Sequence, residues 1–315
     1  MLLQIILLIV GFVLLIKGAD IFVDGASATA QNFKVSKVLI GLTIVAFGTS
    51  APELAVSLQA LAKGSTDMVL GNVIGSNITN ALLILGVATV IHPIVVKQNT
   101  VKKELPLCVL ISTLLVVLYL DVEINHYNAN VISRSDALAI ILFFAIFVYY
   151  IISISRNKID EDNLPSKYST VKALLLTFFG LVGIVFGSNF VVDSATYIAN
   201  ELGVSERIIS LTIVAIGTSL PELVTTIMSS IKKEQDILVG NILGSNIFNI
   251  CIVLGIPVAL FGSITPSGFN MIDIVMLLLS AIILFIFARS GKKITRVEGV
   301  ALLLLYVIYY MLVFL

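Results

Sequence analysis

The chain has 315 residues, of which 58% are hydrophobic and 12% charged, and its mean hydropathy is +1.10. A water-soluble domain carries about 25% charged residues, so this composition excludes one and indicates a membrane protein. Nineteen basic residues balance nineteen acidic ones, which leaves no basic field for nucleic acid. Cys108 and Cys251 lie in apolar runs without the spacing of a metal site, so we expect them to pack, and we expect no cofactor.

Ten stretches are apolar and long enough to cross a bilayer, which takes about 20 helical residues. In chain order, the predicted spans are 2–24, 38–61, 68–91, 104–121, 136–155, 172–198, 207–231, 237–261, 270–289 and 296–315. The loops between them are short, apart from a polar linker at 156–171. The chain therefore reads as an all-α polytopic membrane protein in the lipid bilayer.

Basic residues gather on one side of these spans. Loops after the odd-numbered spans hold fifteen Lys and Arg residues, whereas the opposite loops hold only Lys63, Arg134 and Arg207. Basic loops stay in the cytoplasm. We therefore expect a multi-pass protein of the cell membrane, with both termini outside and the linker in the cytoplasm.

Two motifs occur twice, and both recur at the same offset along the chain. GLTIVAFGTSAPEL from Gly41 matches SLTIVAIGTSLPEL from Ser210, and GNVIGSNITN from Gly71 matches GNILGSNIFN from Gly240. Across the longer repeated segments, 22 of 46 ungapped pairs are identical. The segments compared are 41–86 and 210–255. Chance does not produce this agreement, so the sequence predicts an internal duplication.

The two halves of the chain, 1–155 and 172–315, each hold five predicted spans. Because five is odd, the second half enters the membrane in the opposite orientation. The fold predicted is ten transmembrane helices in two inverted five-helix repeats. In secondary transporters of this kind, broken helices of the two repeats meet near the bilayer midplane and form the substrate site.

Glu53 and Glu222 occupy equivalent positions near the centres of two spans. A charge there costs about 2.5 to 3.5 kcal/mol on insertion scales and usually marks an ion path or proton relay. Neither span has Lys or Arg in its interior, so we expect a diffusible cation as the partner. The alternative is two protonated carboxylic acids that hold helices together.

Hydroxyl groups and main-chain carbonyls accompany each acid. Thr49 and Ser50 precede Glu53 by four and three residues, which places them on its helix face. The second repeat has the same GTSxPE spacing. The proline in each motif cannot donate a backbone hydrogen bond, so it releases carbonyls near 46–49 and 215–218.

The third and eighth predicted spans carry polar stripes at four-residue spacing. They consist of Asn72, Ser76 and Asn80, and of Asn241, Ser245 and Asn249. GxxxG patterns in the same spans, at Gly71 and Gly240, permit close helix approach. Asn77 and Asn246 point away from the stripes, and we expect them to pack.

The resulting set of ligands contains carboxylates, hydroxyls, amide oxygens and carbonyls, without His or thiolate. Such oxygens suit hard cations, among them calcium, which takes about six to eight of them. Sodium uses similar oxygens. Two carboxylates balance one calcium ion or two sodium ions, so the two ions would compete for the same charges, which is the basis of exchange.

At these motifs the chain resembles the cation/calcium exchanger superfamily, and most closely its prokaryotic sodium/calcium exchangers, over essentially its whole length. The resemblance implies antiport of Ca²⁺ against Na⁺ by alternating access, without enzymatic catalysis, by a protein that functions as a monomer. The ion ligands it implies are Glu53, Glu222, Thr49, Thr218, Ser50, Ser219, Ser76, Ser245, Asn80 and Asn249, together with the carbonyls of Ala46 and Ala215.

One position departs from some relatives. Potassium-dependent exchangers have an aspartate where this chain has Asn249, which argues against potassium co-transport and leaves the number of sodium ions per calcium open. The main alternative is a proton/calcium exchanger on the same scaffold, although proton-coupled relatives typically show GNxxE in the first repeat. An intramembrane enzyme built on Ser50 or Ser219 would lack a His or Lys base in its span. A channel would not couple two fluxes.

Asp20 and Asp24 lie near the end of the first predicted span. We expect them at an interface, with a gating role as the alternative. Lys17 is expected to reach the membrane surface or to pair with Asp20.

Overall fold

The computed structural model describes residues 2–126, 128–156, 166–203, 215–265 and 271–314. The chain divides into two compact units. The first contains Met1–Pro52 and Asn157–Asn241, and the second contains Glu53–Arg156 and Ile242–Leu315. Each unit therefore takes segments from both halves of the sequence. Most of the predicted linker, residues 157–165, lies outside the described part of the chain, as does the start of the seventh predicted span.

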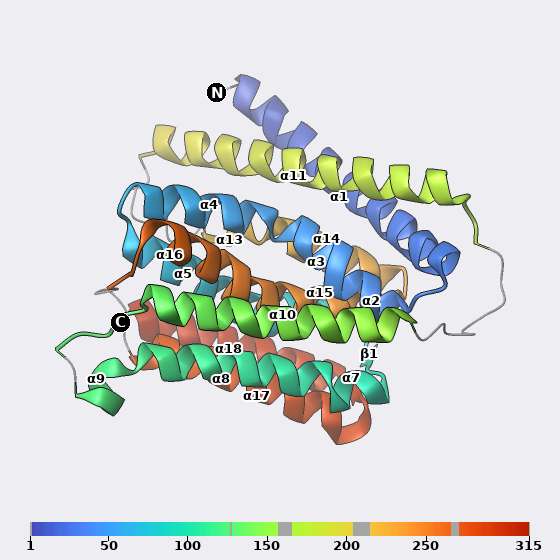
Figure 1. Cartoon of the computed structure of the whole chain (residues 1–315). Helices are drawn as coiled ribbons and strands as arrows, with labels where there is room; N and C mark the ends of the chain where they lie inside the picture. The colour runs from blue at the N-terminus through green and yellow to red at the C-terminus, as the bar shows by residue number, and fades with distance from the viewer. Residues whose placement is uncertain (1, 127, 157–165, 204–214, 266–270, 315) are drawn as a thin grey trace. The chain divides into compact units, whose positions relative to one another are not determined.

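Two long helices dominate the first unit. They are α1 (Leu2–Phe33) and α11 (Thr170–Glu201), which pack along each other (Figure 1). A Cβ added at Gly18 would lie 2.8 Å from the backbone nitrogen of Ile184, and one at Gly180 would lie 2.5 Å from that of Phe22. Glycines thus let the two backbones touch, as small residues do between membrane helices.

The remaining helices of the first unit are short. They are α2 (Lys37–Ile40), the π-helical segment η1 (Gly41–Val45), α3 (Ala46–Thr49), α13 (Ala215–Thr218) and α14 (Leu220–Ile231). Val224 and Met228 of α14 pack against a core that includes Leu15, Ala19 and Phe22 of α1. The apolar face of α14 is therefore the face that contacts α1.

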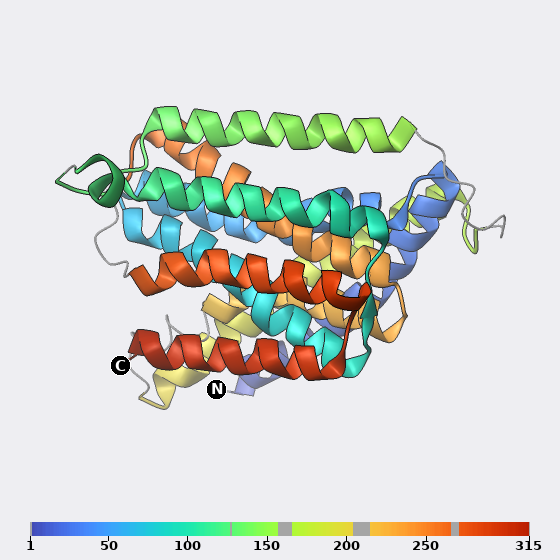
Figure 2. The same cartoon turned by 90° about the horizontal axis from the view of Figure 1, so that it is seen from below.

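The second unit is also helical. Its elements are α4 (Ala51–Ala62, from Glu53 on), α5 (Thr66–Ile78), η2 (Thr79–Ile84), α6 (Leu85–Ile91), α7 (Gln98–Lys102), α8 (Glu104–Tyr119), α9 (Asp121–Asn125), α10 (Arg134–Arg156), the second part of α15 (Gln235–Phe248), η4 (Asn249–Leu254), α16 (Gly255–Phe261), α17 (Met271–Gly291) and α18 (Arg296–Phe314). In Figure 2, α10, α8, α17 and α18 follow one another from green to red, and each contacts the next.

A short antiparallel ladder joins β1 (Ile94–Val95) to β2 (Lys293–Ile294), with Ile94 opposite Ile294. Ile94 and Ile294 are both 1% exposed. The ladder ties the loop after α6 to the loop before α18, which keeps the ends of these helices together.

Seven helices in the described part of the chain are long and apolar enough to cross a membrane, or up to eight with a bent pair in which Lys37–Thr49 meets α4 at 43°. Two of the ten predicted spans do not meet this criterion within the described residues. Helix α8 has only 16 residues, and of the seventh predicted span only the part from Ala215 on is described. The chain is thus shown as a helical, multi-span membrane protein, and its ten-helix inverted topology stays a prediction.

Candidate ion-binding site

Each of the two acidic motifs breaks its helix at the same residue. Ser50 has φ −89° and ψ 6°, and Ser219 has φ −88° and ψ 6°, values of the bridge region rather than of an α-helix. Pro221 cannot donate to the carbonyl of Gly217, and the Ser188 hydroxyl donates to that oxygen instead, at 3.1 Å. The GTSxPE motif therefore produces one local geometry twice, as its proline predicts.

Polar side chains from both sequence repeats surround Glu222 in the first unit. The Glu222 side chain is 1% exposed, and its Oε1 accepts a hydrogen bond from the Ser50 hydroxyl at 2.7 Å. Thr49 donates to Oδ1 of Asn241 at 3.2 Å, and Asn241 Nδ2 donates to Thr226 Oγ1 at 3.1 Å. These contacts bring two of the predicted ligands, Thr49 and Ser50, into one cluster with the second acid.

The partner of Ser50 differs from the expected one. Residue spacing placed Ser50 on the face of Glu53, but its hydroxyl donates to Glu222. Ser50 has non-helical dihedral angles, so the three-residue neighbour relation of a continuous helix does not extend across it.

In the second unit, Glu53 is 1% exposed and its helix is braced by Asn72. Asn72 Nδ2 lies 2.9 Å from the Glu53 carbonyl oxygen and 2.9 Å from the Ser57 hydroxyl, and donates to both. The contact between Asn72 and Ser57 repeats, at equivalent positions, the one between Asn241 and Thr226. The asparagines at these positions thus hold the acid-bearing helices in place.

Ser57 and Thr226 were not among the predicted site residues. Each lies four residues after its acid, on the same helix face, so the repeat combined with this spacing was a signal that could have found them.

Two π-helical segments, η2 and η4, begin at or just before Asn80 and Asn249. Such segments are rare and occur frequently at functional sites. Asn80 Nδ2 donates to Asn246 Oδ1 at 3.1 Å. Asn246 thus makes a hydrogen bond between helices, in keeping with the packing role expected for it, and it fixes which way the Asn80 amide faces.

Asn249 and Ser245 are both 0% exposed. Within the described residues, the Asn249 amide and the Ser245 hydroxyl have no hydrogen-bond partner, and neither has Asn80 Oδ1. A buried polar group left in this state costs about 1 to 3 kcal/mol. Three of the predicted ligand positions therefore carry buried oxygens that an ion could satisfy.

The other predicted ligands have these surroundings. Ser76 and Ser219 are buried, and Thr218 is half-buried at the end of α13. The carbonyl of Ala46 accepts the backbone N–H of Ser50 at 3.0 Å, and the Thr49 hydroxyl lies 3.4 Å from the same oxygen. Ala215 begins α13, and its side chain lies outside the described part of the structure. The two units are not placed relative to each other, so a chamber shared by both acids stays a prediction.

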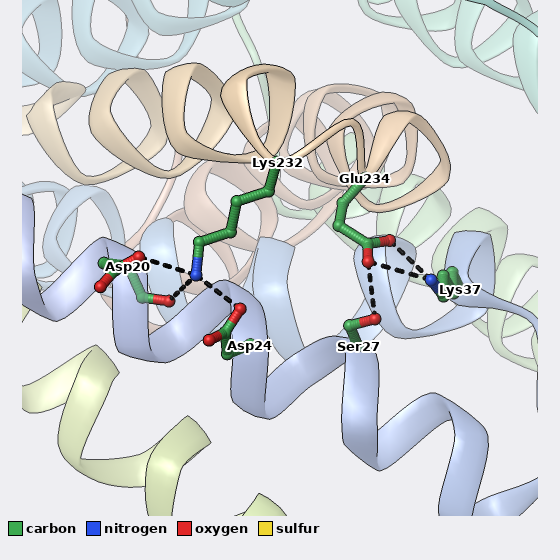
Figure 3. A network of polar contacts seen from close by, with 6 residues as sticks. All are labelled: Asp20, Asp24, Ser27, Lys37, Lys232 and Glu234. Carbon is green, nitrogen blue, oxygen red and sulfur yellow. Dashed lines mark hydrogen bonds and ion pairs between the residues drawn. The ribbon is translucent and has the colours of Figure 1, made fainter. Parts of the chain in front are cut away.

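A cluster of ion pairs joins α1 to the segment that follows α14 (Figure 3). Lys232 Nζ lies 2.8 Å from Asp20 Oδ1 and 2.5 Å from Asp24 Oδ1. It also donates to the Asp20 carbonyl at 2.6 Å. Asp20 thus pairs with Lys232, where the sequence suggested Lys17.

The same segment is held a second time through Glu234. Lys37 Nζ lies 2.8 Å from Glu234 Oε2, and the Ser27 hydroxyl donates to Oε1 at 2.9 Å (Figure 3). Sequence reasoning missed Lys37, Lys232 and Glu234. Their partners lie in the opposite half of the sequence, and no local spacing encodes such pairs.

These features define a class of protein. Buried acids in broken membrane helices, duplicated with the same bracing contacts, are the architecture of a transporter rather than of a soluble-type enzyme. Comparison with known proteins then gives the family. The family model described as "Sodium/calcium exchanger protein" matches residues 3–153 and 172–315. The chain belongs to the sodium/calcium exchanger family.

Individual relatives agree over nearly the full length. The chain is 37% identical to "Inner membrane protein YrbG" of Escherichia coli, covering 96% of this chain and 94% of that one. It is 32% identical to "Sodium/calcium exchanger MaX1" of Methanosarcina acetivorans, covering 98% of each. A solved structure of the sodium-calcium exchanger NCX_Mj matches with a TM-score of 0.87 at 32% identity, covering 98% of each chain.

Proposed function

We propose that this protein exchanges sodium for calcium across the cell membrane, with Glu53 and Glu222 as the charged ligands. The observation that carries the proposal is the pair of repeat-equivalent glutamates, each 1% exposed, in helices that contain neither Lys nor Arg. Family membership supports it, and the relative MaX1 bears the name of a sodium/calcium exchanger.

Neutral oxygens near the acids supply the rest of the coordination in this proposal. They are the side chains of Thr49, Thr218, Ser50, Ser219, Ser76, Ser245, Asn80 and Asn249 and the carbonyls of Ala46 and Ala215. The oxygens of Asn249 and Ser245 have no hydrogen-bond partner among the residues that the structure describes. They support this assignment, because a cation would satisfy them. Occupation by Ca²⁺ and by Na⁺ is mutually exclusive, since both ions use the same two negative charges.

The orientation proposed has both termini outside and the 156–171 linker in the cytoplasm, as the basic loops indicate. Both native cysteines are buried, so an aqueous thiol reagent should not label them. Single cysteines introduced beside Lys97 and beside Lys63 would then report on the two opposite sides of the membrane. In intact cells, a membrane-impermeant thiol reagent should label the second and spare the first. The reverse pattern would refute the orientation.

The test of the function is radioactive calcium uptake into proteoliposomes under sodium, potassium and pH gradients imposed in turn. Uptake driven by an outward sodium gradient, and abolished in Glu222→Gln, is the expected result. Uptake that follows the pH gradient and ignores sodium would replace the proposal with a proton/calcium exchanger. Uptake that follows neither gradient and passes as unitary currents would indicate a channel.

A further inference from the structure

Helix α14 has a second face besides the one that packs on α1. Leu220, Val224 and Met228 pack against the core to which α1 contributes. Thr225 and Ser229 lie three and seven residues after Glu222, which places them with the acid on the opposite side of the helix. Both are 0% exposed. A line of polar groups thus runs from Glu222 toward the end of α14 without reaching solvent.

The hydroxyls of Thr225 and Ser229 lie one turn apart on one face of α14 and differ from the hydroxyls that pair within their own helix. A buried Thr or Ser on a helix commonly donates to the carbonyl one turn earlier. Thr113 donates to Val109 at 2.8 Å and Thr177 to Ala173 at 2.9 Å. Thr225 Oγ1 and Ser229 Oγ have no hydrogen-bond partner in the described part of the chain. Two adjacent buried hydroxyls therefore lack the partner that burial demands.

The first repeat does not require these hydroxyls. Its residues at the equivalent positions are Val56 and Ala60. By contrast, the bracing hydroxyl is present in both repeats, as Ser57 and Thr226. The difference shows that Thr225 and Ser229 are not part of the common helix packing, so they serve something that only the second repeat has.

The geometry and charge of the pair suit a monovalent cation. Residues four apart on a helix have Cβ atoms about 5 to 6 Å apart, and an ion with oxygen ligands at about 2.3 to 2.6 Å spans that interval. Two hydroxyls are neutral and so compensate a single charge more readily than a double one. Glu222, one turn before Thr225, supplies a negative charge on the same helix face.

We infer that Thr225 and Ser229 form an additional sodium site on α14, which an ion occupies between Glu222 and the end of the helix. That end carries Lys232, held by Asp20 and Asp24, and the proposed orientation places it at the cytoplasmic side. The inference rests on the proposed sodium/calcium exchange and adds a sodium-selective step to it.

Two fluxes in the same proteoliposomes test the site. The variants are Thr225→Val, Ser229→Ala and the double substitution, with Thr225→Ser as the variant that keeps a hydroxyl. The matched control is Ser280→Ala, which removes a buried hydroxyl that does have a partner, the Leu277 carbonyl at 2.8 Å. Calcium/calcium exchange without sodium reports on folding and on calcium binding, and sodium-driven calcium uptake reports on sodium.

If one oxygen ligand contributes as much free energy as one hydrogen bond, its loss weakens sodium binding about two- to tenfold. The sodium concentration for half-maximal exchange then rises by the same factor. We expect that rise in Thr225→Val and Ser229→Ala, a larger one in the double variant, and calcium/calcium exchange retained in all. Thr225→Ser and Ser280→Ala should behave as the wild type. An unchanged sodium dependence in the double variant would overturn the site, as would equal losses of both fluxes. If the wild type shows no sodium-driven uptake, the proposed function fails, and the site fails with it.

Discussion

The helices that carry the two acids, α4 and α14, are alike where they begin and differ where they continue. Both follow a serine with nearly identical dihedral angles. An asparagine braces each of them through a hydroxyl four residues after the acid, at 2.9 Å from Asn72 and 3.1 Å from Asn241. The duplication has thus conserved the chemistry that positions each carboxylate, down to individual hydrogen bonds.

The two repeats differ in the polar groups near their acid-bearing helices. The Asn80 amide is fixed by Asn246, whereas the equivalent Asn249 makes no side-chain hydrogen bond within the described residues. Hydroxyls at Thr225 and Ser229 replace the apolar Val56 and Ala60. The two repeats therefore carry the same acid in different surroundings. Such a difference would suit a site that opens to each side of the membrane in turn.

The largest expected effect is common to both repeats. Glu53→Gln and Glu222→Gln should each abolish sodium-driven calcium uptake, because each removes one of the two charges that balance calcium in the proposed site. Folding should persist, since a neutral amide costs less to insert than a carboxylate. Uptake in proteoliposomes and elution as a single species in detergent measure the two quantities. Undiminished exchange in either variant would separate that acid from the ion site.

The second prediction contrasts two glycines of the GxxxG patterns that stand at different positions in their repeats. A Cβ at Gly240 would lie 2.6 Å from the Val38 carbonyl and 2.9 Å from Gly41 Cα, whereas one at Gly75 has nothing within 4 Å among the described residues. Gly240→Ala should lower the free energy of unfolding by about 1 to 3 kcal/mol through overpacking. Gly75→Ala should leave it unchanged or raise it by up to about 1 kcal/mol through helix propensity. Thermal unfolding in detergent compares them, and equal midpoints would contradict the close approach.

The third prediction concerns the bracing asparagines. Asn241→Ala and Asn72→Ala each leave a buried hydroxyl without its donor, which should cost about 1 to 3 kcal/mol of stability. Asn241→Ala should cost more, because Asn241 is fully buried whereas Asn72 is half-buried. Asn77→Ala is the control, since among the described residues the Asn77 amide donates to Val73 of its own helix and to no other helix. Denaturation midpoints that rank the control lowest would refute the bracing role.

The smallest effect is expected at the ion pairs of Lys232. The partners Asp20 and Asp24 are 43% and 36% exposed, and pairs at this exposure contribute about 0 to 1 kcal/mol. Lys232→Ala should therefore shift the unfolding midpoint slightly, and high salt should reduce the shift. A large, salt-insensitive loss would show that the pair acts as a buried structural element.

Much of this protein follows from its sequence. Composition alone excludes a soluble domain, and the constant offset between the repeated motifs reveals the duplication. The proline in each motif predicts the helix break, because a missing N–H acts within one turn. Burial of Glu53 and Glu222 follows from their place in apolar spans. All of these are properties of composition or of contacts within a few residues.

Tertiary structure decided the partners. The hydroxyl of Ser50 reaches Glu222 rather than Glu53, Asn246 orients Asn80, and Lys232 binds the aspartates of α1. Each of these contacts joins residues from different halves of the sequence, and which side chains meet depends on how the helices cross. Helical periodicity fixes the face on which a residue lies, but the element that packs on that face is chosen only when the whole chain has folded.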